Sequence, residues 1–318
     1  MNQNENIDEI KRLADEGDAE SMYIYAQKLQ KGEGVSINKK AAAEYFKRAS
    51  EKDHPLASLK YGEMLYNGSG IAVNKKEAFK YVQKSADLGE IDAMLQCARM
   101  YEYGDGIEKN YTEAAKYVKM CADLGNIYGL YNYGVYLWNG IAVERNEFKS
   151  FEYFKQAADQ GLPQAMANLA NIYHNGCQGV EINIIESAKY TKMAADKGHS
   201  DSIAQYALML KIGEGVDKDE KEAIRYLQIG IEKENPDCMY LYAEMLYDGS
   251  GIEENKTEAA KYFKMSADKG NRNGMLRYAE MLKNGKGVDQ NNEEFSRYFR
   301  MAIQQGALEN AEIGCGIQ

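Results

Sequence analysis

Glycine recurs along this 318-residue chain at almost constant intervals. It stands at Gly32, Gly68, Gly104, Gly140, Gly176, Gly213, Gly249 and Gly285. Every interval is 36 residues except one of 37, where the extra residue lies in the loop at 176–179. Self-similarity at this period is typical of repeat proteins in which each unit is one supersecondary motif.

Two further columns follow each of these glycines. An asparagine or aspartate comes six or seven residues later, and a tyrosine comes seven residues after that, at Tyr45, Tyr81, Tyr117, Tyr153, Tyr190, Tyr226, Tyr262 and Tyr298. Asparagine and aspartate favour helix N-caps because their short side-chain oxygens accept a bond from an unpaired backbone N–H. Glutamate stands three residues after the cap in six of the eight periods, as in a capping box. Each period therefore predicts a helix that begins after the cap and carries the tyrosine.

Another helix is predicted before each loop that starts at a recurring glycine. We call this helix the first helix of the pair, and the helix that follows the loop and carries the tyrosine the second helix. All three prolines, Pro55, Pro163 and Pro236, occupy one place in the repeat. That place fits the first turn of a helix, where proline is tolerated. A small residue recurs where the two helices must approach each other, at Ala26, Gly62, Ala98, Gly134, Ala170, Ala207, Ala243 and Ala279. Fourteen of the 25 tyrosines fall in two columns, one on each helix, which are predicted to lie in the core.

These patterns predict an all-α fold. Eight helix–loop–helix repeats of about 36 residues would stack into an α/α superhelix, or solenoid, because one helix pair cannot bury its apolar face alone. The predicted repeats span 18–53, 54–89, 90–125, 126–161, 162–198, 199–234, 235–270 and 271–306. We expect a lone second helix at 7–17 to cap the N-terminus. We expect 307–318 to start a ninth first helix at Leu308 that stops at Gly314 and Gly316. The whole chain, 1–318, is then one solenoid domain.

The columns resemble the Sel-1-like repeat, a relative of the tetratricopeptide repeat. The resemblance covers about residues 7 to 314 and is carried by segments such as AEMLYDGSGI at 243–252, EAAKY at 258–262 and ADKG at 267–270. It implies a solenoid whose first helices line a concave surface, and a role as an adaptor or scaffold in protein assemblies. Some members serve ER-associated degradation. A cysteine-rich bacterial branch carries disulfides between helices, and weak β-lactam hydrolysis is associated with it.

No catalytic or metal-binding motif accompanies the repeats. The cysteines form no CxxC motif and do not recur in paired columns, so we expect no disulfide and no metal knuckle; they are Cys97, Cys121, Cys177, Cys238 and Cys315. The loops lack the Gly-Lys-Ser/Thr sequence of a P-loop. The three histidines, His54, His174 and His199, form no zinc-binding pair. We therefore expect no cofactor, no metal and no enzymatic activity.

Charge and hydropathy restrict the partners and the compartment. A net charge of −10 and a pI near 5.1 argue against nucleic-acid binding, which needs a basic face, and against docking on anionic lipid. Apolar runs are only a few residues long, so no membrane insertion is expected. The polar, acidic start at 1–9 resembles no secretory signal. We expect a cytoplasmic protein with reduced thiols.

A second stripe on the first helices is the predicted partner surface. In the fourth repeat it consists of Tyr128, Tyr131, Val135 and Trp138, the only tryptophan. Aromatic side chains rimmed by polar groups are typical of binding hot spots. With Asn168, Asn171 and His174 of the fifth repeat, these residues form the predicted site for a protein or peptide. Two alternatives stay open: Tyr128 and Trp138 pack against the next helix or the loop near Ile141, and His174 is a surface histidine without a task.

The sequence thus predicts a non-enzymatic scaffold or adaptor that binds a protein or peptide. A hydrolase is the first alternative, by analogy with the cysteine-rich branch. An adaptor in ER-associated degradation is the second. The sequence indicates neither the identity of the partner nor the oligomeric state.

Overall fold

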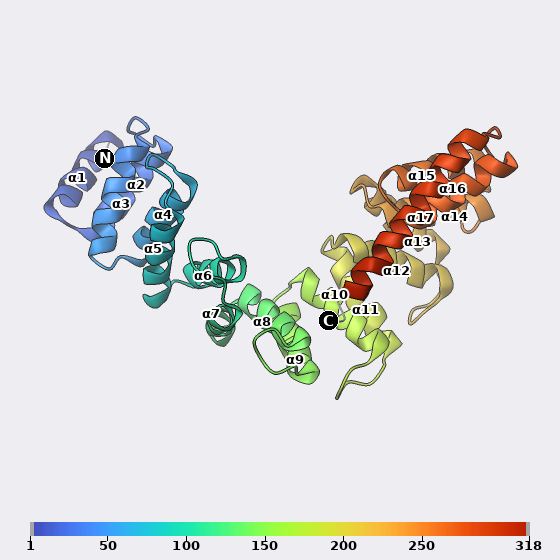
Figure 1. Ribbon diagram of the computed structural model, residues 1–318, viewed down its shortest axis with the longest axis horizontal. Helices are drawn as coiled ribbons and strands as arrows, with labels where there is room; N and C mark the ends of the chain where they lie inside the picture. The colour runs from blue at the N-terminus through green and yellow to red at the C-terminus, as the bar shows by residue number, and fades with distance from the viewer. Residues whose placement is uncertain (1–2, 316–318) are drawn as a thin grey trace. The chain divides into compact units, whose positions relative to one another are not determined.

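The computed structural model describes the backbone of residues 3–315 and the side chains of residues 7–306. Within this part of the chain there are 17 helices and no strand, which confirms the predicted all-α fold (Figure 1). Two compact units are distinguished, Met1–Ala157 and Ala158–Gln318. Each unit is a stack of helix pairs. None of the helices in the described residues combines the length and the apolar character needed to cross a bilayer.

The first unit begins with the single helix α1 (Gln3–Glu16). Its helix pairs are α2 (Ala19–Lys31) with α3 (Lys39–Glu51), α4 (Pro55–Asn67) with α5 (Lys75–Asp87), α6 (Ile91–Tyr103) with α7 (Tyr111–Asp123), and α8 (Ile127–Asn139) with α9 (Glu147–Asp159). The boundary between the two units, after Ala157, falls in the last turn of α9. In the second unit the pairs are α10 (Pro163–Asn175) with α11 (Ile184–Asp196), α12 (Ser200–Ile212) with α13 (Glu220–Glu232), α14 (Pro236–Asp248) with α15 (Lys256–Asp268), and α16 (Arg272–Asn284) with α17 (Asn292–Cys315). Each of the three prolines stands in the first turn of a first helix, as predicted.

The predicted N-caps of the second helices are confirmed in all eight repeats. Each Asn or Asp side chain accepts a bond from the backbone N–H three residues later, as Asn74 Oδ1 does from Glu77 N at 3.0 Å. The return bond of a capping box is not formed in the described repeats, so that part of the prediction is wrong. The backbone N–H of each cap donates instead to a carbonyl of the preceding first helix, as Asn74 N does to Leu65 O at 2.9 Å. The cap therefore ties the two helices of a pair together.

The two tyrosine columns pack against each other, and their predicted place in the core is confirmed for nine of the fourteen tyrosines; the other five are half-buried at its edge: Tyr45, Tyr81, Tyr133, Tyr153 and Tyr262. In six repeats the rings form edge-to-face pairs with centroids 4.6 to 5.0 Å apart. This geometry suits the aromatic quadrupole. The third and fifth repeats have Cys97 and Leu169 in the first-helix column. There a tyrosine one turn later, Tyr101 or Tyr173, stacks on the second-helix tyrosine instead.

Small residues are required where the paired helices touch. A Cβ on Gly62 would lie 2.8 Å from Val82 Cγ2, and a Cβ on Gly134 would lie 2.8 Å from the Phe154 ring. Real carbon atoms do not approach that closely, so a larger residue would force the helices apart. The predicted column of small residues is confirmed at these two positions.

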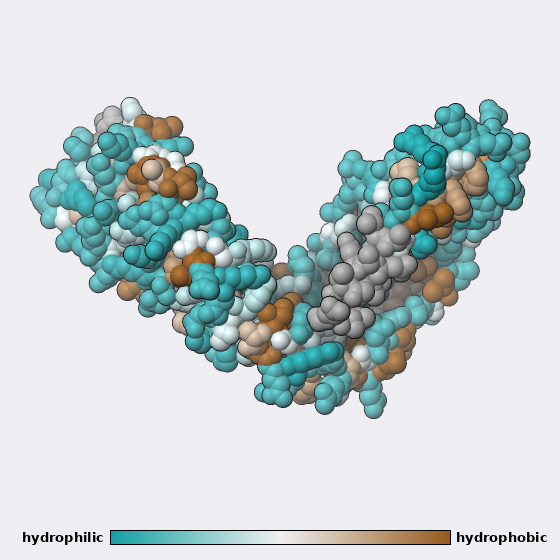
Figure 2. Space-filling view, in the orientation of Figure 1, coloured by the Kyte–Doolittle hydropathy of each residue, from teal (hydrophilic) through white to brown (hydrophobic). Residues whose placement is uncertain are grey.

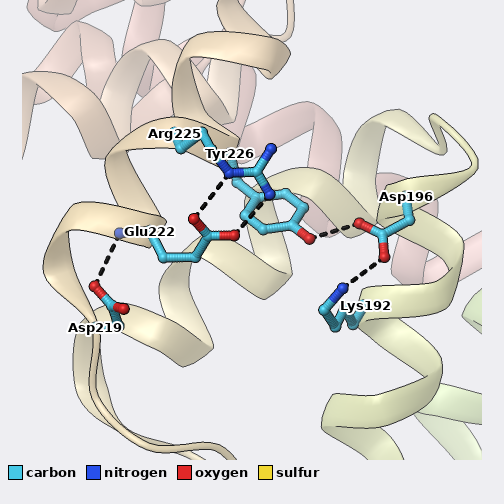
Figure 3. Close-up of polar contacts among 6 residues, drawn as sticks. All are labelled: Lys192, Asp196, Asp219, Glu222, Arg225 and Tyr226. Atoms are coloured by element: carbon cyan, nitrogen blue, oxygen red, sulfur yellow. Dashed lines mark hydrogen bonds and ion pairs between the residues drawn. The ribbon is translucent and has the colours of Figure 1, made fainter.

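Consecutive second helices are joined by a tyrosine–aspartate bond (Figure 3). The hydroxyl of Tyr226 in α13 donates to Asp196 Oδ1 at the end of α11, at 2.5 Å. Asp196 also accepts from Lys192 at 2.6 Å. The same bond joins Tyr298 to Asp268 and Tyr45 to Asp15, each at 2.5 Å. In these three places the tyrosine thus also links its second helix to the preceding one, which for Tyr45 is α1.

The C-terminal helix differs from the prediction. We expected α17 to end at Gly306 and a separate helix to start at Leu308, but α17 continues without a break to Cys315. In several other turns a residue such as Asn126 or Asn271 follows the glycine and caps the next first helix. Ala307 stands in that place, and alanine is a poor N-cap and a strong helix former. The predicted stop at Gly314 is absent, and Gly316 lies outside the described residues.

Candidate functional site

Two adjoining cavities lie over the first helices of the first unit. Cavity A has a volume of about 590 Å³ and is lined by Glu63, Tyr66, Asn67, Asp92, Leu95, Gln96, Ala98, Arg99, Glu102, Tyr103, Val118, Tyr128 and Asn132. Cavity B has a volume of about 320 Å³ and is lined by Glu102, Tyr103, Lys109, Tyr111, Asn132, Val135, Tyr136 and Ile141. Glu102, Tyr103 and Asn132 line both. We call the two cavities together the first-helix groove.

Tyrosine rings stand unusually exposed along this groove. Tyr103 is 73% exposed, Tyr128 is 56% exposed and Tyr111 is 43% exposed. The surface drawn in Figure 2 is mostly hydrophilic, with hydrophobic side chains in small separate patches. Large aromatic side chains left in water and gathered at a cavity mark a surface suited to binding.

Three carboxylates, of Glu63, Asp92 and Glu102, line the groove together with two cations, Arg99 in cavity A and Lys109 in cavity B. Glu63 is paired with Lys60 at 2.8 Å. Glu102 is half-buried and accepts a hydrogen bond from the buried Tyr136 hydroxyl, and burial together with this carboxylate raises the pKa of Tyr136 well above its usual value. Asp92 is exposed and makes no ion pair among the described side chains. The groove thus carries negative charge that the protein neutralises only in part.

One wall of cavity A is fixed by a small polar cluster. The Tyr66 hydroxyl donates to Asp105 Oδ2 at 2.7 Å, and Lys75 donates to Asp105 Oδ1 at 2.7 Å. The Lys75 ammonium lies 4.7 Å from the centre of the Tyr66 ring. The hydrogen bond from Lys75, with that from Tyr66, lowers the pKa of Asp105. These contacts hold the Tyr66 ring in one orientation, so this wall is preorganised.

Cavity B lies where the fourth repeat departs from the loop pattern. In the other loops a second glycine sits against the start of the preceding second helix; a Cβ on Gly106 would lie 2.1 Å from Lys75 O, and one on Gly215 would lie 2.2 Å from Ile184 O. The fourth repeat has Ala142 at this place, with φ 55, and Tyr111 as its counterpart on α7. Ala142 therefore carries a Cβ where those loops have none, and its neighbour Ile141 lines cavity B together with Tyr111.

The predicted stripe on α8 divides between the groove and its surroundings. Tyr128 lines cavity A and Val135 lines cavity B. Tyr131 is half-buried, and its ring lies 5.7 Å from that of Phe154 on α9. Trp138 is half-buried and lines neither cavity.

Sequence reasoning missed the most exposed ring in the groove, Tyr103. A signal was available: Tyr103 comes directly before the recurring glycine, in a column that holds Lys, Asn or Asp in six of the other seven repeats. Tyr111 and Ile141 were missed as well, because Tyr111 is the first residue of a second helix and Ile141 lies in a loop, where helical offsets do not apply.

The other predicted residues lie on α10, in the second unit. Asn168 is half-buried. Asn171 is exposed, and its carbonyl accepts a bond from Asn175 Nδ2 at 3.1 Å. His174 is half-buried, and its Nδ1 is buried without a hydrogen-bond partner among the described residues. These three polar residues all lie on α10 and belong to the second unit.

Three of the described cysteines are buried, Cys177 is half-buried, and the described side chains form no metal cluster. Residues 7–306 contain no group of three or more His, Cys, Asp or Glu side chains placed to hold a metal ion. Cys97, Cys121 and Cys238 are free and buried. Burial raises the pKa of Cys97 and Cys238 to about 12 and that of Cys121 to about 11. A buried neutral thiol is a poor nucleophile and metal ligand.

The structure repeats pairs of helices, most of them 13 residues long, with capped starts and tight glycine loops. This arrangement defines a helix-pair repeat protein of the tetratricopeptide-like solenoid class. The model of the Sel1 repeat matches residues 19–54, 55–90, 91–126, 127–162, 163–199, 200–235, 236–271 and 273–306. The chain belongs to the Sel1 repeat family, which confirms the resemblance drawn from its columns. A search of curated proteins gave no match.

Two solved structures share this fold. A protective antigen of uropathogenic Escherichia coli strains is similar with a TM-score of 0.87 and 24% identity over 94% of this chain. The chain spans 64% of that protein's length. A Sel1 repeat protein from Oxalobacter formigenes is similar with a TM-score of 0.76 and 24% identity, over 94% of this chain and 87% of the other. At this identity the likeness establishes the fold alone.

Proposed function

We propose that this protein is a non-enzymatic scaffold or adaptor that binds a protein or peptide partner on the face formed by its first helices. Proteins of the Sel1 repeat family are typically protein-interaction modules. One observation carries the proposal: an open groove over three successive first helices, α4, α6 and α8, with Tyr103 and Tyr128 exposed at its walls. A partner would cover rings that the free protein leaves in water, which favours binding.

The predicted residues take different parts in this proposal. Tyr128 and Val135 would contact the partner directly, since they line the cavities. Tyr131 and Trp138 stand on the same face of α8, because offsets of 3, 7 and 10 residues return to one side of a helix. We assign Trp138 a contact beyond cavity B. Asn168, Asn171 and His174 are proposed as a further polar contact surface on α10.

The remaining expectations fit such a protein. The acidic net charge of −10 disfavours a nucleic-acid partner. A cytoplasmic location is part of the proposal and agrees with thiols that are expected to be reduced. No cofactor is required for binding of this kind.

The test uses peptides selected from a displayed library of random 12-residue sequences on the full chain. Fluorescence anisotropy then measures the Kd of each selected peptide for the wild type and for Tyr128→Ala and Trp138→Ala. Tyr128→Ala should weaken binding at least about tenfold, as hot-spot aromatics do. Phe148→Ala is the matched control, because Phe148 is a comparably exposed ring, 45%, on the second helix α9.

The two Ala variants at exposed rings should keep the thermal midpoint of the wild type, since neither ring is in the core. If Phe148→Ala weakens binding as much as Tyr128→Ala, or if neither does, the proposal is wrong. If Trp138→Ala lowers the thermal midpoint by several degrees and leaves Kd unchanged, Trp138 is a packing residue and its assigned contact is wrong.

A further inference from the structure

We infer that the first-helix groove recognises an extended peptide segment that carries a basic side chain close to a large apolar one, with the basic side chain in cavity A and the apolar side chain in cavity B. This inference rests on the proposed function and adds the chemistry of the partner. The two cavities differ in their walls, and that difference is what specifies the peptide.

Cavity A suits a cation. Asp92 and Glu102 present carboxylates to it that no ammonium or guanidinium of the described chain neutralises through an ion pair. The rings of Tyr66, Tyr103 and Tyr128 surround the same space. A lysine or arginine side chain placed among aromatic faces and carboxylates gains both cation–π and ionic attraction.

Arg99 also lines cavity A, and its charge must be considered. It is exposed and forms no ion pair with Asp92 or Glu102. Its positive charge acts on Asp105, whose pKa it helps to lower after the larger contributions of Lys75 and Tyr66. Asp105 does not line the cavity. Because Arg99 forms no ion pair with Asp92 or Glu102, these two carboxylates remain available to a ligand.

Cavity B suits an apolar side chain. Val135 and Ile141 supply aliphatic wall, and Tyr103 and Tyr111 supply aromatic wall. Lys109 also lines this cavity, with its ammonium 4.7 Å from the centre of the Tyr111 ring, so its charge disfavours a basic side chain here. The Tyr136 hydroxyl is engaged by Glu102 and does not need a partner from the ligand. A volume of about 320 Å³ accommodates one large apolar side chain rather than a helix.

The shared wall places the two side chains near each other in the peptide. Glu102, Tyr103 and Asn132 line both cavities, so a segment that fills both passes directly over them. The Asn132 amide has a donor and an acceptor that fit a peptide backbone. The net charge of −10 on the whole protein also favours encounter with a basic segment.

The test is a selection of random 12-residue peptides, displayed on phage, on the full-length wild-type protein. We expect the enriched sequences to carry arginine or lysine within a few positions of leucine, isoleucine, methionine or phenylalanine. The Kd of a selected synthetic peptide is then measured for two variants, Glu102→Gln and Asp92→Asn. Glu102→Gln keeps an acceptor for the Tyr136 hydroxyl, and Asp92→Asn changes an exposed side chain. Glu152→Gln on α9 is the matched control, since Glu152 is exposed and lines neither cavity.

Glu102→Gln should weaken binding about tenfold at low salt, as expected for loss of a close charge pair, and Glu152→Gln should change it less than about twofold. The difference should shrink as ionic strength rises from about 0.05 M to about 0.5 M. The inference is overturned if binding depends on Tyr128 but not on Glu102 or Asp92, or if the enriched peptides lack basic residues; the proposed function then survives. Selection that yields no binder, or peptides indifferent to Tyr128, contradicts both.

Discussion

Replacing Tyr226 by phenylalanine isolates the bond between neighbouring repeats. Tyr226 is 1% exposed, and its ring makes an edge-to-face pair with Tyr206 at 4.9 Å. Phenylalanine keeps this packing and removes only the hydroxyl, which donates to Asp196 Oδ1 at 2.5 Å (Figure 3). The change in free energy of unfolding therefore reports this one hydrogen bond.

The expected loss is about 1.5 to 2 kcal/mol. A hydrogen bond to a charged group contributes about 1.5 to 3 kcal/mol. The lower part of this range applies because Asp196 is 45% exposed and keeps its bond from Lys192. Tyr262→Phe is the matched control: Tyr262 occupies the same column and pairs with Tyr242 at 4.9 Å, but its hydroxyl makes no hydrogen bond within the described side chains. That variant should lose less than about 0.5 kcal/mol.

The effect of Tyr226→Phe should depend on pH. Burial raises the pKa of Asp196, but the hydrogen bonds from Lys192 and Tyr226 lower it by more, so the pKa lies below its usual value. A lowered native pKa gives stability that is present above the unfolded pKa of about 3.9 and is lost as pH falls through the native value. The difference between wild type and variant should therefore be full near neutral pH and should shrink at pH below about 4.

Urea unfolding followed by circular dichroism measures these differences, at neutral pH and at low pH. Equal losses in Tyr226→Phe and Tyr262→Phe would show that the bond adds nothing beyond ring packing. A loss in Tyr226→Phe that grows as pH falls would refute the assigned role of the Asp196 carboxylate.

Three further changes test other parts of the structure. Ala142→Gly should raise the free energy of unfolding by about 1 kcal/mol in urea titrations, because Ala142 has a left-handed φ of 55 that disfavours a Cβ; a loss of stability would contradict this. Cys97, Cys121 and Cys238 should react far more slowly with a water-soluble thiol reagent in the native protein than after unfolding, because each is buried and its pKa is raised; equal rates would show that they are accessible. Tyr117→Ala should cost about 3 to 5 kcal/mol, because Tyr117 is only 7% exposed, and hydrogen exchange should speed up in α6 and α7; unchanged exchange there would argue against its core position.

The helix pairs were predictable because each signal is repeated. One Asn before a helix is weak evidence, but the cap seen at Asn74 recurs in every repeat, and its geometry is local to three residues. The return bond was not predictable in the same way. Whether Glu77 or a carbonyl such as Leu65 takes the cap N–H depends on how the loop folds back on the first helix, which sequence spacing does not show.

The groove was only partly predictable. Helical offsets correctly place Tyr128 and Val135 on the face that carries the cavities. Tyr103 and Tyr111 stand at a helix end and a helix start, where offsets say little about direction. Ile141, which lines cavity B beside them, lies in a loop whose course helical spacing does not predict.

Photo-crosslinking of a selected peptide tests the central claim most directly. The peptide carries a photoreactive side chain next to its apolar residue, and mass spectrometry identifies the residues it labels on the full-length protein. The account predicts labels on the first helices α6 and α8, around Tyr103, Asn132 and Val135, and their loss in Tyr128→Ala. Labels on the second helices α5 and α7 instead, or labelling unchanged in Tyr128→Ala, would contradict it.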